Sequence, residues 1–206
     1  MATASIAIAT PLEPEERLRA DLYALFARLF VGPPDAGLLR LIASSPLIDG
    51  AVADSPFVGR WSRLCAAASV MDPAAAADEY DALFGGIGHS EISLFASHYV
   101  GEGAPGAGTH FLVALRAALA RDGIGRKEGE NMPEDHLSAL LESMRLFIED
   151  DAALPTQHAF FETFVAPWYG ACCSAIASHR LANFYKTVAE CVREFLVVET
   201  QSFQVA

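Results

Sequence analysis

The spacing of the apolar residues constrains the fold of this chain more than any other feature. Between residues 14 and 31, leucine and phenylalanine recur three or four positions apart, at Leu18, Leu22, Leu25, Phe26 and Leu29. This spacing places the apolar side chains on one face of a helix. Pro14 followed by two glutamates is typical of a helix start, and Gly32 with the two prolines after it is typical of an end. The segment predicts an amphipathic helix.

Similar apolar patterns recur along most of the chain. They predict further helices over residues 37–43, 56–70, 73–84, 109–122, 133–150, 156–164, 168–179 and 181–199. No run alternates with period two between hairpin turns, so no sheet is expected. With 206 residues of which 52% are hydrophobic, the chain can fill one large core. We expect an all-α fold, a single-domain helical bundle of about eight to ten helices over residues 1–206.

Two glycine-rich stretches interrupt the helical pattern. Residues 85–108 contain seven glycines and no helical stripe, but they keep Leu94, Phe95 and Tyr99. We expect a long Gly-rich loop here, and either a functional loop or an ordinary surface loop with apolar anchors fits that composition. Residues 123–129 predict a second loop or a hinge.

The charge balance limits the classes of partner. The 26 acidic and 14 basic residues give a net charge of −12, which repels nucleic acid and anionic membranes and attracts a cationic peptide. Solubility alone would also explain that charge. Residues 163–179 are uncharged, but Pro167 and Gly170 interrupt them, so we expect buried core and no stable membrane insertion. Residues 1–12 lack the basic start of an export signal, so we expect a cytoplasmic protein.

The sequence lacks the common catalytic and metal-binding patterns. Glu-x-x-His, His-Glu-x-x-His, Gly-x-Ser-x-Gly and the phosphate-binding loop motif are all absent. The four cysteines form no Cys-x-x-Cys pair, and reduced thiols are expected. We therefore expect no catalytic residue, no metal and no cofactor.

Two segments carry the remaining functional signal. The first is 79–86, which runs into 89–99, and the second is 133–137, which opens a predicted helix. Pro133 in the first helical position, with Glu134 and Asp135 behind it, puts negative charge beside free backbone N–H groups. A helix cap explains both acids, and His136 fits a half-buried core position beside the apolar face.

Together these segments resemble the TorD/DmsD/NarJ family of redox-enzyme maturation chaperones. The matching residues, in three successive motifs, are Tyr80, Leu83 and Phe84, then Phe95, Ser97 and Tyr99, then Glu134, Asp135 and His136. The similarity covers residues 14–200 and includes Phe160-Phe161, Pro167-Trp168 and Phe184-Tyr185. Leu94 and Gly86 stand where the family often has proline, and Phe95 stands where it often has tryptophan or tyrosine.

The resemblance implies a chaperone that binds without covalent chemistry. Such a protein binds the twin-arginine signal peptide, the apo-form of a molybdenum-cofactor oxidoreductase, or both. It holds this client until the cofactor is inserted and the enzyme is exported. The implied client-binding residues are Tyr80, Leu83, Phe84, Glu91, Leu94, Phe95, Ser97, Tyr99, Glu134, Asp135 and His136. Acids beside aromatic side chains suit a peptide with a basic start and an apolar core. We expect Asp135 to pair with a client arginine.

Two alternative functions remain open on the sequence. One is a NarJ-like assembly chaperone that does not read the signal peptide, and the other is a small helical metal-dependent enzyme that uses His136 with nearby acids. The oligomeric state is open too. The chain could be a monomer, or a domain-swapped dimer with residues 123–129 as its hinge.

Overall fold

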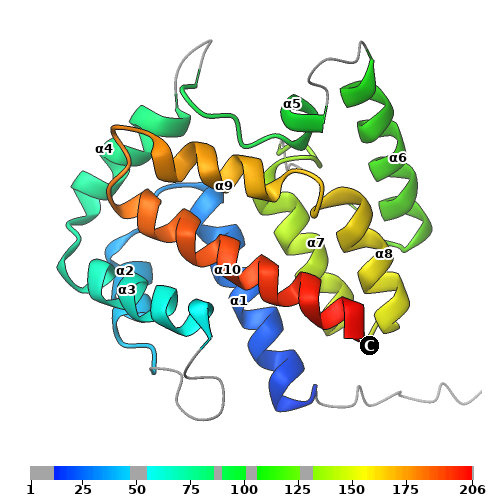
Figure 1. Ribbon diagram of the computed structural model, residues 1–206, viewed down its shortest axis with the longest axis horizontal. Coiled ribbons are helices and arrows are strands. Elements are labelled where there is room, and N and C mark those ends of the chain that lie inside the picture. Colours follow the sequence, from blue (N-terminus) through cyan, green and yellow to red (C-terminus); the bar gives the residue numbers. More distant parts are fainter. Residues whose placement is uncertain (1–11, 47–54, 86–89, 101–105, 126–131, 206) are drawn as a thin grey trace, which may run out of the picture.

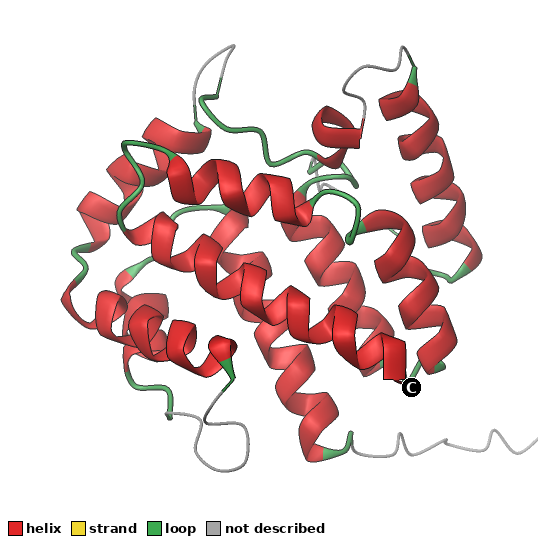
Figure 2. Ribbon diagram, in the orientation of Figure 1, coloured by secondary structure: helices red, strands yellow, loops and turns green. Residues whose placement is uncertain are grey.

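The computed structural model describes residues 12–46, 55–85, 90–100, 106–125 and 132–205. These residues form ten α helices (Figure 1) and contain no β strand (Figure 2). The helices are α1 (Pro14–Val31), α2 (Ala36–Ala43), α3 (Pro56–Val70), α4 (Pro73–Phe84), α5 (Ala96–Val100), α6 (Ala107–Arg121), α7 (Leu137–Glu149), α8 (Leu154–Phe164), α9 (Tyr169–Ser178) and α10 (Phe184–Val205). The all-α prediction and the expected number of helices are confirmed.

Local sequence signals set several of the helix starts. Four helices, α1, α3, α4 and α8, have proline in the first or second position, where its missing N–H costs no hydrogen bond. The Asp72 carboxylate caps α4 by accepting hydrogen bonds from the N–H groups of Ala74 and Ala75. Asp35 caps α2 in the same way, with its carboxylate 2.7 Å from the nitrogen of Leu38. These boundaries follow from short-range chemistry.

The core forms where α1 packs between α7 and α10. In Figure 1 the long helix α10 crosses in front of α1 and α7, and α3 and α9 pack against α10. The ring of Phe195 lies 4.9 Å from that of Tyr23 and 5.4 Å from that of Phe26, centroid to centroid. All three side chains are buried. Aromatic packing therefore binds the first helix to the last.

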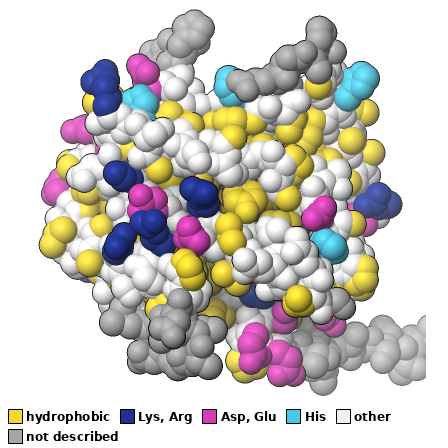
Figure 3. Space-filling model, in the orientation of Figure 1, with side chains coloured by type: hydrophobic (Ala, Val, Ile, Leu, Met, Phe, Trp, Pro, Cys, Tyr) yellow, Lys and Arg dark blue, Asp and Glu magenta, His cyan; other side chains and the backbone are white. Residues whose placement is uncertain are grey.

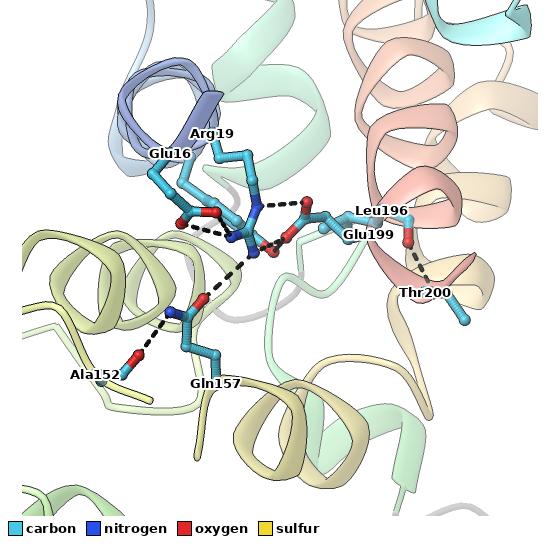
Figure 4. A network of polar contacts seen from close by, with 8 residues as sticks. Glu16, Arg19, Ala152, Gln157, Leu196, Glu199 and Thr200 are labelled. Carbon is cyan, nitrogen blue, oxygen red and sulfur yellow. Dashed lines mark hydrogen bonds and ion pairs between the residues drawn. The ribbon is translucent and has the colours of Figure 1, made fainter. Parts of the chain in front are cut away.

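A buried charge network joins the same two helices (Figure 4). The guanidinium of Arg19 on α1 donates to both carboxylate oxygens of Glu199 on α10, at 2.9 and 2.7 Å, and also to Glu16. Glu199 is only 2% exposed and accepts a further hydrogen bond from the hydroxyl of Tyr23. Burial works against the charge of Arg19, but the hydrogen bonds and charges of Glu199 and Glu16 together outweigh it and raise the arginine pKa. The Gln157 amide oxygen of α8 lies 3.4 Å from the same guanidinium.

The structure corrects three boundaries that the sequence predicted. The helix expected to open at Pro133 begins at Leu137, because residues 133–136 form a turn that pairs with another segment. The expected loop over residues 85–108 contains the short helix α5, while 86–89 and 101–105 lie outside the described residues. The last helix spans Phe184–Val205 and not 181–199. Of the predicted hinge at 123–129, residues 126–129 lie outside the described residues.

The uncharged stretch 163–179 contributes to the core as expected. Val165, Trp168 and Ile176 are at most 1% exposed, and no described helix is long and apolar enough to cross a membrane. All four cysteines are buried and unbridged. Burial raises the pKa of the Cys172 thiol to about 12, so this side chain behaves as a neutral core residue.

The Arg19 network gives a first prediction. The substitution Arg19→Ala leaves the buried Glu199 carboxylate without its cation and should lower the free energy of unfolding by about 3 kcal/mol or more. Arg17→Ala is the matched control, because the 3.7 Å pair of Arg17 with Glu149 is largely exposed and should contribute less than about 1 kcal/mol. Urea unfolding of both variants measures the difference. Equal losses would show that the network does not anchor α10.

Candidate functional site

The second and third sequence motifs meet in a short antiparallel contact. The N–H of Leu137 donates to the carbonyl of Leu94 at 2.8 Å, and the N–H of Ala96 donates to the carbonyl of Asp135 at 2.9 Å. These two bonds form an isolated β-bridge between Phe95 and His136. We call residues 94–97 and 134–138 together the joint. It fixes one segment against another that lies about forty residues further along the chain.

Asp135 strengthens the joint through its side chain. The carboxyl group is buried, with the residue 2% exposed, and its Oδ2 accepts a hydrogen bond of 3.1 Å from the N–H of Ser97. Ser97 lies in the first turn of α5, where backbone N–H groups have no partner within the helix. Asp135 therefore caps α5 and not the helix that follows it in sequence. A client arginine could reach this carboxylate only if the joint opened.

His136 provides the cap of α7. Its backbone is extended, and the N–H of Ser138 donates to its Nδ1 at 3.2 Å. The residue is 5% exposed, and burial lowers the pKa of its imidazole to about 4, against the opposing effect of Asp135. A neutral ring with Nδ1 as acceptor carries its proton on Nε2. The predicted half-buried core histidine is thus a buried helix cap.

Two of the expected binding side chains point outward from this segment. Phe95 is 37% exposed, and its ring meets the His136 ring nearly edge-on at a centroid distance of 5.1 Å. The Glu91 side chain is 60% exposed, with its carboxylate 3.7 Å from Nε2 of His179. These two residues present an aromatic ring and an acid to solvent on one short segment.

The other expected residues of the second motif anchor the segment. Leu94 is buried at 3% exposure, and Ser97 contributes the N–H that Asp135 binds. The Tyr99 hydroxyl donates to the carbonyl of Ser93 at 2.8 Å, and its ring stacks on that of Trp168 at 5.6 Å. Phe95 is therefore held by neighbours on both sides in sequence.

The first motif lies in an aromatic cluster away from these contacts. The Tyr80 hydroxyl donates to the carbonyl of Phe30, and the rings of Tyr80 and Phe84 contact the ring of Tyr185 at 5.7 and 5.2 Å. Leu83 is fully buried. The link to the second motif is a backbone bond, from the N–H of Ile92 to the carbonyl of Leu83 at 3.1 Å. These three side chains thus support the start of the segment from within the core.

Glu79, directly before the first motif, has a role that the sequence analysis missed. Its carboxylate accepts hydrogen bonds of 2.8 to 3.0 Å from the N–H groups of Asn183, Phe184 and Tyr185. These donors lie at the start of α10, so Glu79 caps that helix from α4. No local pattern marks this role, because cap and helix are about a hundred residues apart.

A groove of about 630 Å³ lies between α1, α6 and α7. Glu134 and Ser138 of the joint line it, and the Glu134 carboxylate pairs with Arg116 of α6 at 3.2 Å. Its other described charged residues are Arg28, Glu142 and Arg145. No pattern in the sequence indicates this groove, because its walls come from three helices. Among the described residues, no cluster of three or more histidine, cysteine or acidic side chains could hold a metal ion.

The comparison with protein families decides how this site is interpreted. Residues 52–174, more than half of the chain, match the family described as the nitrate reductase delta subunit. The chain belongs to this family. Its members are chaperones for the maturation of molybdoenzymes. A comparison with curated proteins found no match. The matched range includes all three motifs and both sides of the joint.

Family membership agrees with the chemistry of the joint. The nitrate reductase delta subunit family serves enzyme assembly, and the joint offers hydrogen-bonded support for an exposed ring. Burial keeps His136 neutral, and Asp135 is occupied by a backbone N–H. The arrangement suits a surface that binds a polypeptide.

The role of Asp135 can be tested with two substitutions. Asp135→Ala leaves the N–H of Ser97 without its acceptor and should lower the free energy of unfolding by about 1 to 3 kcal/mol. Asp135→Asn keeps an oxygen in place and should cost about 1 kcal/mol or less. Hydrogen exchange at the Ser97 amide should speed up strongly in the alanine variant and little in the asparagine variant. Unchanged exchange in both would argue against the cap.

The lowered pKa of His136 predicts a pH effect on stability. Because the folded-state pKa lies below the ordinary value of 6.5, the unfolded chain takes up the proton first as the pH falls. The histidine should therefore make stability fall as the pH drops from about 6.5 towards 4. Melting temperatures of the native chain and of His136→Asn, compared between pH 7.5 and 5.5, measure this. Asparagine keeps a capping oxygen, so parallel curves would exclude the imidazole as the cause.

Proposed function

We propose that this protein is a cytoplasmic chaperone that binds the twin-arginine signal peptide of a molybdenum-cofactor oxidoreductase, its apo-form, or both. It holds this client until the cofactor is inserted and export can begin. The proposal combines the maturation role of the family with the surface that the joint supports. Binding requires no covalent step and no cofactor of the chaperone's own.

The exposed Phe95 ring on the joint is the observation that carries this proposal. Two backbone hydrogen bonds and the His136 ring hold Phe95 in place, so little conformational entropy is lost when a peptide covers it. An aromatic side chain of this kind is a frequent centre of binding energy in peptide recognition. Glu91 on the same segment supplies an exposed carboxylate for a client cation.

Charge supports a cationic client over an anionic one. The net charge of −12 attracts a peptide that begins with arginines. On the face in Figure 3, lysine and arginine side chains lie at the middle left, where α10 crosses α3, with aspartate or glutamate side chains among them. Hydrophobic side chains are more frequent towards the upper and right parts, over α5, α6, α8 and α9.

Under this proposal Asp135 and His136 act on client binding through the joint. Both are buried, and their polar atoms bind Ser97 and Ser138. Their contribution is to keep Phe95 in the position that the peptide meets. Loss of either group would weaken client binding through disorder of the segment, without a direct contact to the arginines.

A peptide titration tests the function. A fluorescein-labelled twin-arginine signal peptide should bind the purified protein, and Phe95→Ala should weaken binding about tenfold or more, which corresponds to about 1.4 kcal/mol. Val113→Ala is the control, because Val113 is an exposed apolar residue on α6, outside the joint. No binding to the native protein would contradict signal-peptide recognition, and equal effects of the two variants would contradict the role of Phe95.

Salt dependence gives an independent measurement. Because part of the attraction comes from the net negative charge, the dissociation constant should rise as sodium chloride increases from about 0.05 to 0.5 M. A control peptide with glutamine in place of both arginines should lose most of this dependence. If both peptides respond alike, the arginines are not recognised by charge.

A further inference from the structure

We propose that the groove between α1, α6 and α7 is a second binding site, which takes an apolar helical segment of a partner protein. The segment is about two turns long and carries an acidic side chain that pairs with Arg28. This site differs from the Phe95 surface in its walls, in its charge and in the peptide that it fits. It does not depend on recognition of a signal peptide.

The lining of the groove suits a helix. Seven of the seventeen described lining residues are alanine, glycine or serine, five are aliphatic or methionine, and none is aromatic. Small side chains let the backbone of a second helix approach closely, and aliphatic side chains give it apolar contact. The α7 wall from Ser138 to Leu146 is about 12 Å long at 1.5 Å per residue, which matches about two helical turns.

The charges in the groove favour an acidic partner. Its described lining holds three arginines and two glutamates, so the lining itself has one more positive than negative side chain, although the whole chain is strongly negative and Asp35 and Glu149 contact two of the arginines from outside the lining. Both glutamates already face an arginine, since Glu134 pairs with Arg116 at 3.2 Å and Glu142 pairs with Arg145 at 2.6 Å. A client arginine placed here would have to displace one of these partners.

Arg28 is the cation best placed for a partner carboxylate. Arg145 is held by Glu142 and by Glu149, and its side chain is only 20% exposed. Arg28 is 63% exposed and has a 3.8 Å contact with Asp35, itself 66% exposed. An exposed pair at that distance contributes little, so a carboxylate in the groove can replace Asp35.

Two designed peptides test the proposal. Each is a fluorescein-labelled, stapled helix of twelve residues made of leucine and alanine, with two glutamates on one face in the first and two lysines in the second. Fluorescence anisotropy with the full chain should show at least tenfold tighter binding of the glutamate peptide. This preference opposes the net charge of −12, which by itself would favour the lysine peptide.

Variants locate the binding in the groove. Arg28→Glu should abolish or reverse the preference, whereas Arg40→Glu, the same change at an exposed residue of α2 outside the groove, should leave it intact. Ala139→Trp fills the groove from α7 and should weaken both peptides at least tenfold. Ala120→Trp does the same from α6, and it replaces Ala139→Trp if thermal melting shows that the first variant is unfolded.

Three outcomes would overturn the proposal. They are equal affinity for both peptides, equal effects of Arg28→Glu and Arg40→Glu, and binding that survives both tryptophan substitutions. The Phe95 surface is tested separately by the twin-arginine peptide and Phe95→Ala. Failure at one site therefore remains distinguishable from failure at the other.

Discussion

The ion pair of Arg19 with Glu199 is the contact on which the arrangement of the helices most depends. A carboxylate that is 2% exposed costs several kcal/mol to bury unless a cation meets it with good geometry, and here the guanidinium binds both of its oxygens. This requirement fixes the rotation of α10 relative to α1. The hydroxyl of Tyr23 completes the coordination of the carboxylate, so the polar contact is built into the aromatic core.

A fixed α10 has consequences at the other end of the molecule. The start of α10 is capped by Glu79, and the next residue, Tyr80, packs on Tyr185. The end of α4 then holds the segment that leads to Phe95, through the bond between Ile92 and Leu83. The surface that carries the proposed function is thus positioned by core contacts on one side and by the joint on the other.

The sequence predicted the helices well, because their signals are local. Apolar spacing and proline starts identified most of the ten helices to within a few residues. The start of α7 was predicted four residues too early, since Pro133, Glu134 and Asp135 imitate a first helical turn. What overrides that local preference is the β-bridge between Phe95 and His136, which requires extended backbone at His136. Such long-range pairing leaves no periodic trace in the sequence.

In the candidate site, too, local signals could be predicted from the sequence and long-range contacts could not. The motifs identified the joint residues, but not that Asp135 would bind Ser97 or that His136 would cap α7. The groove could not be predicted at all, because Arg28, Arg116 and Arg145 come from three separate helices. Glu134 and Ser138 belong to both features, since they line the groove and form part of the joint. The joint, which is held by backbone hydrogen bonds, therefore contributes to two proposed binding surfaces, the Phe95 surface and the groove. Because different side chains form the two surfaces, one client could bind both of them at the same time.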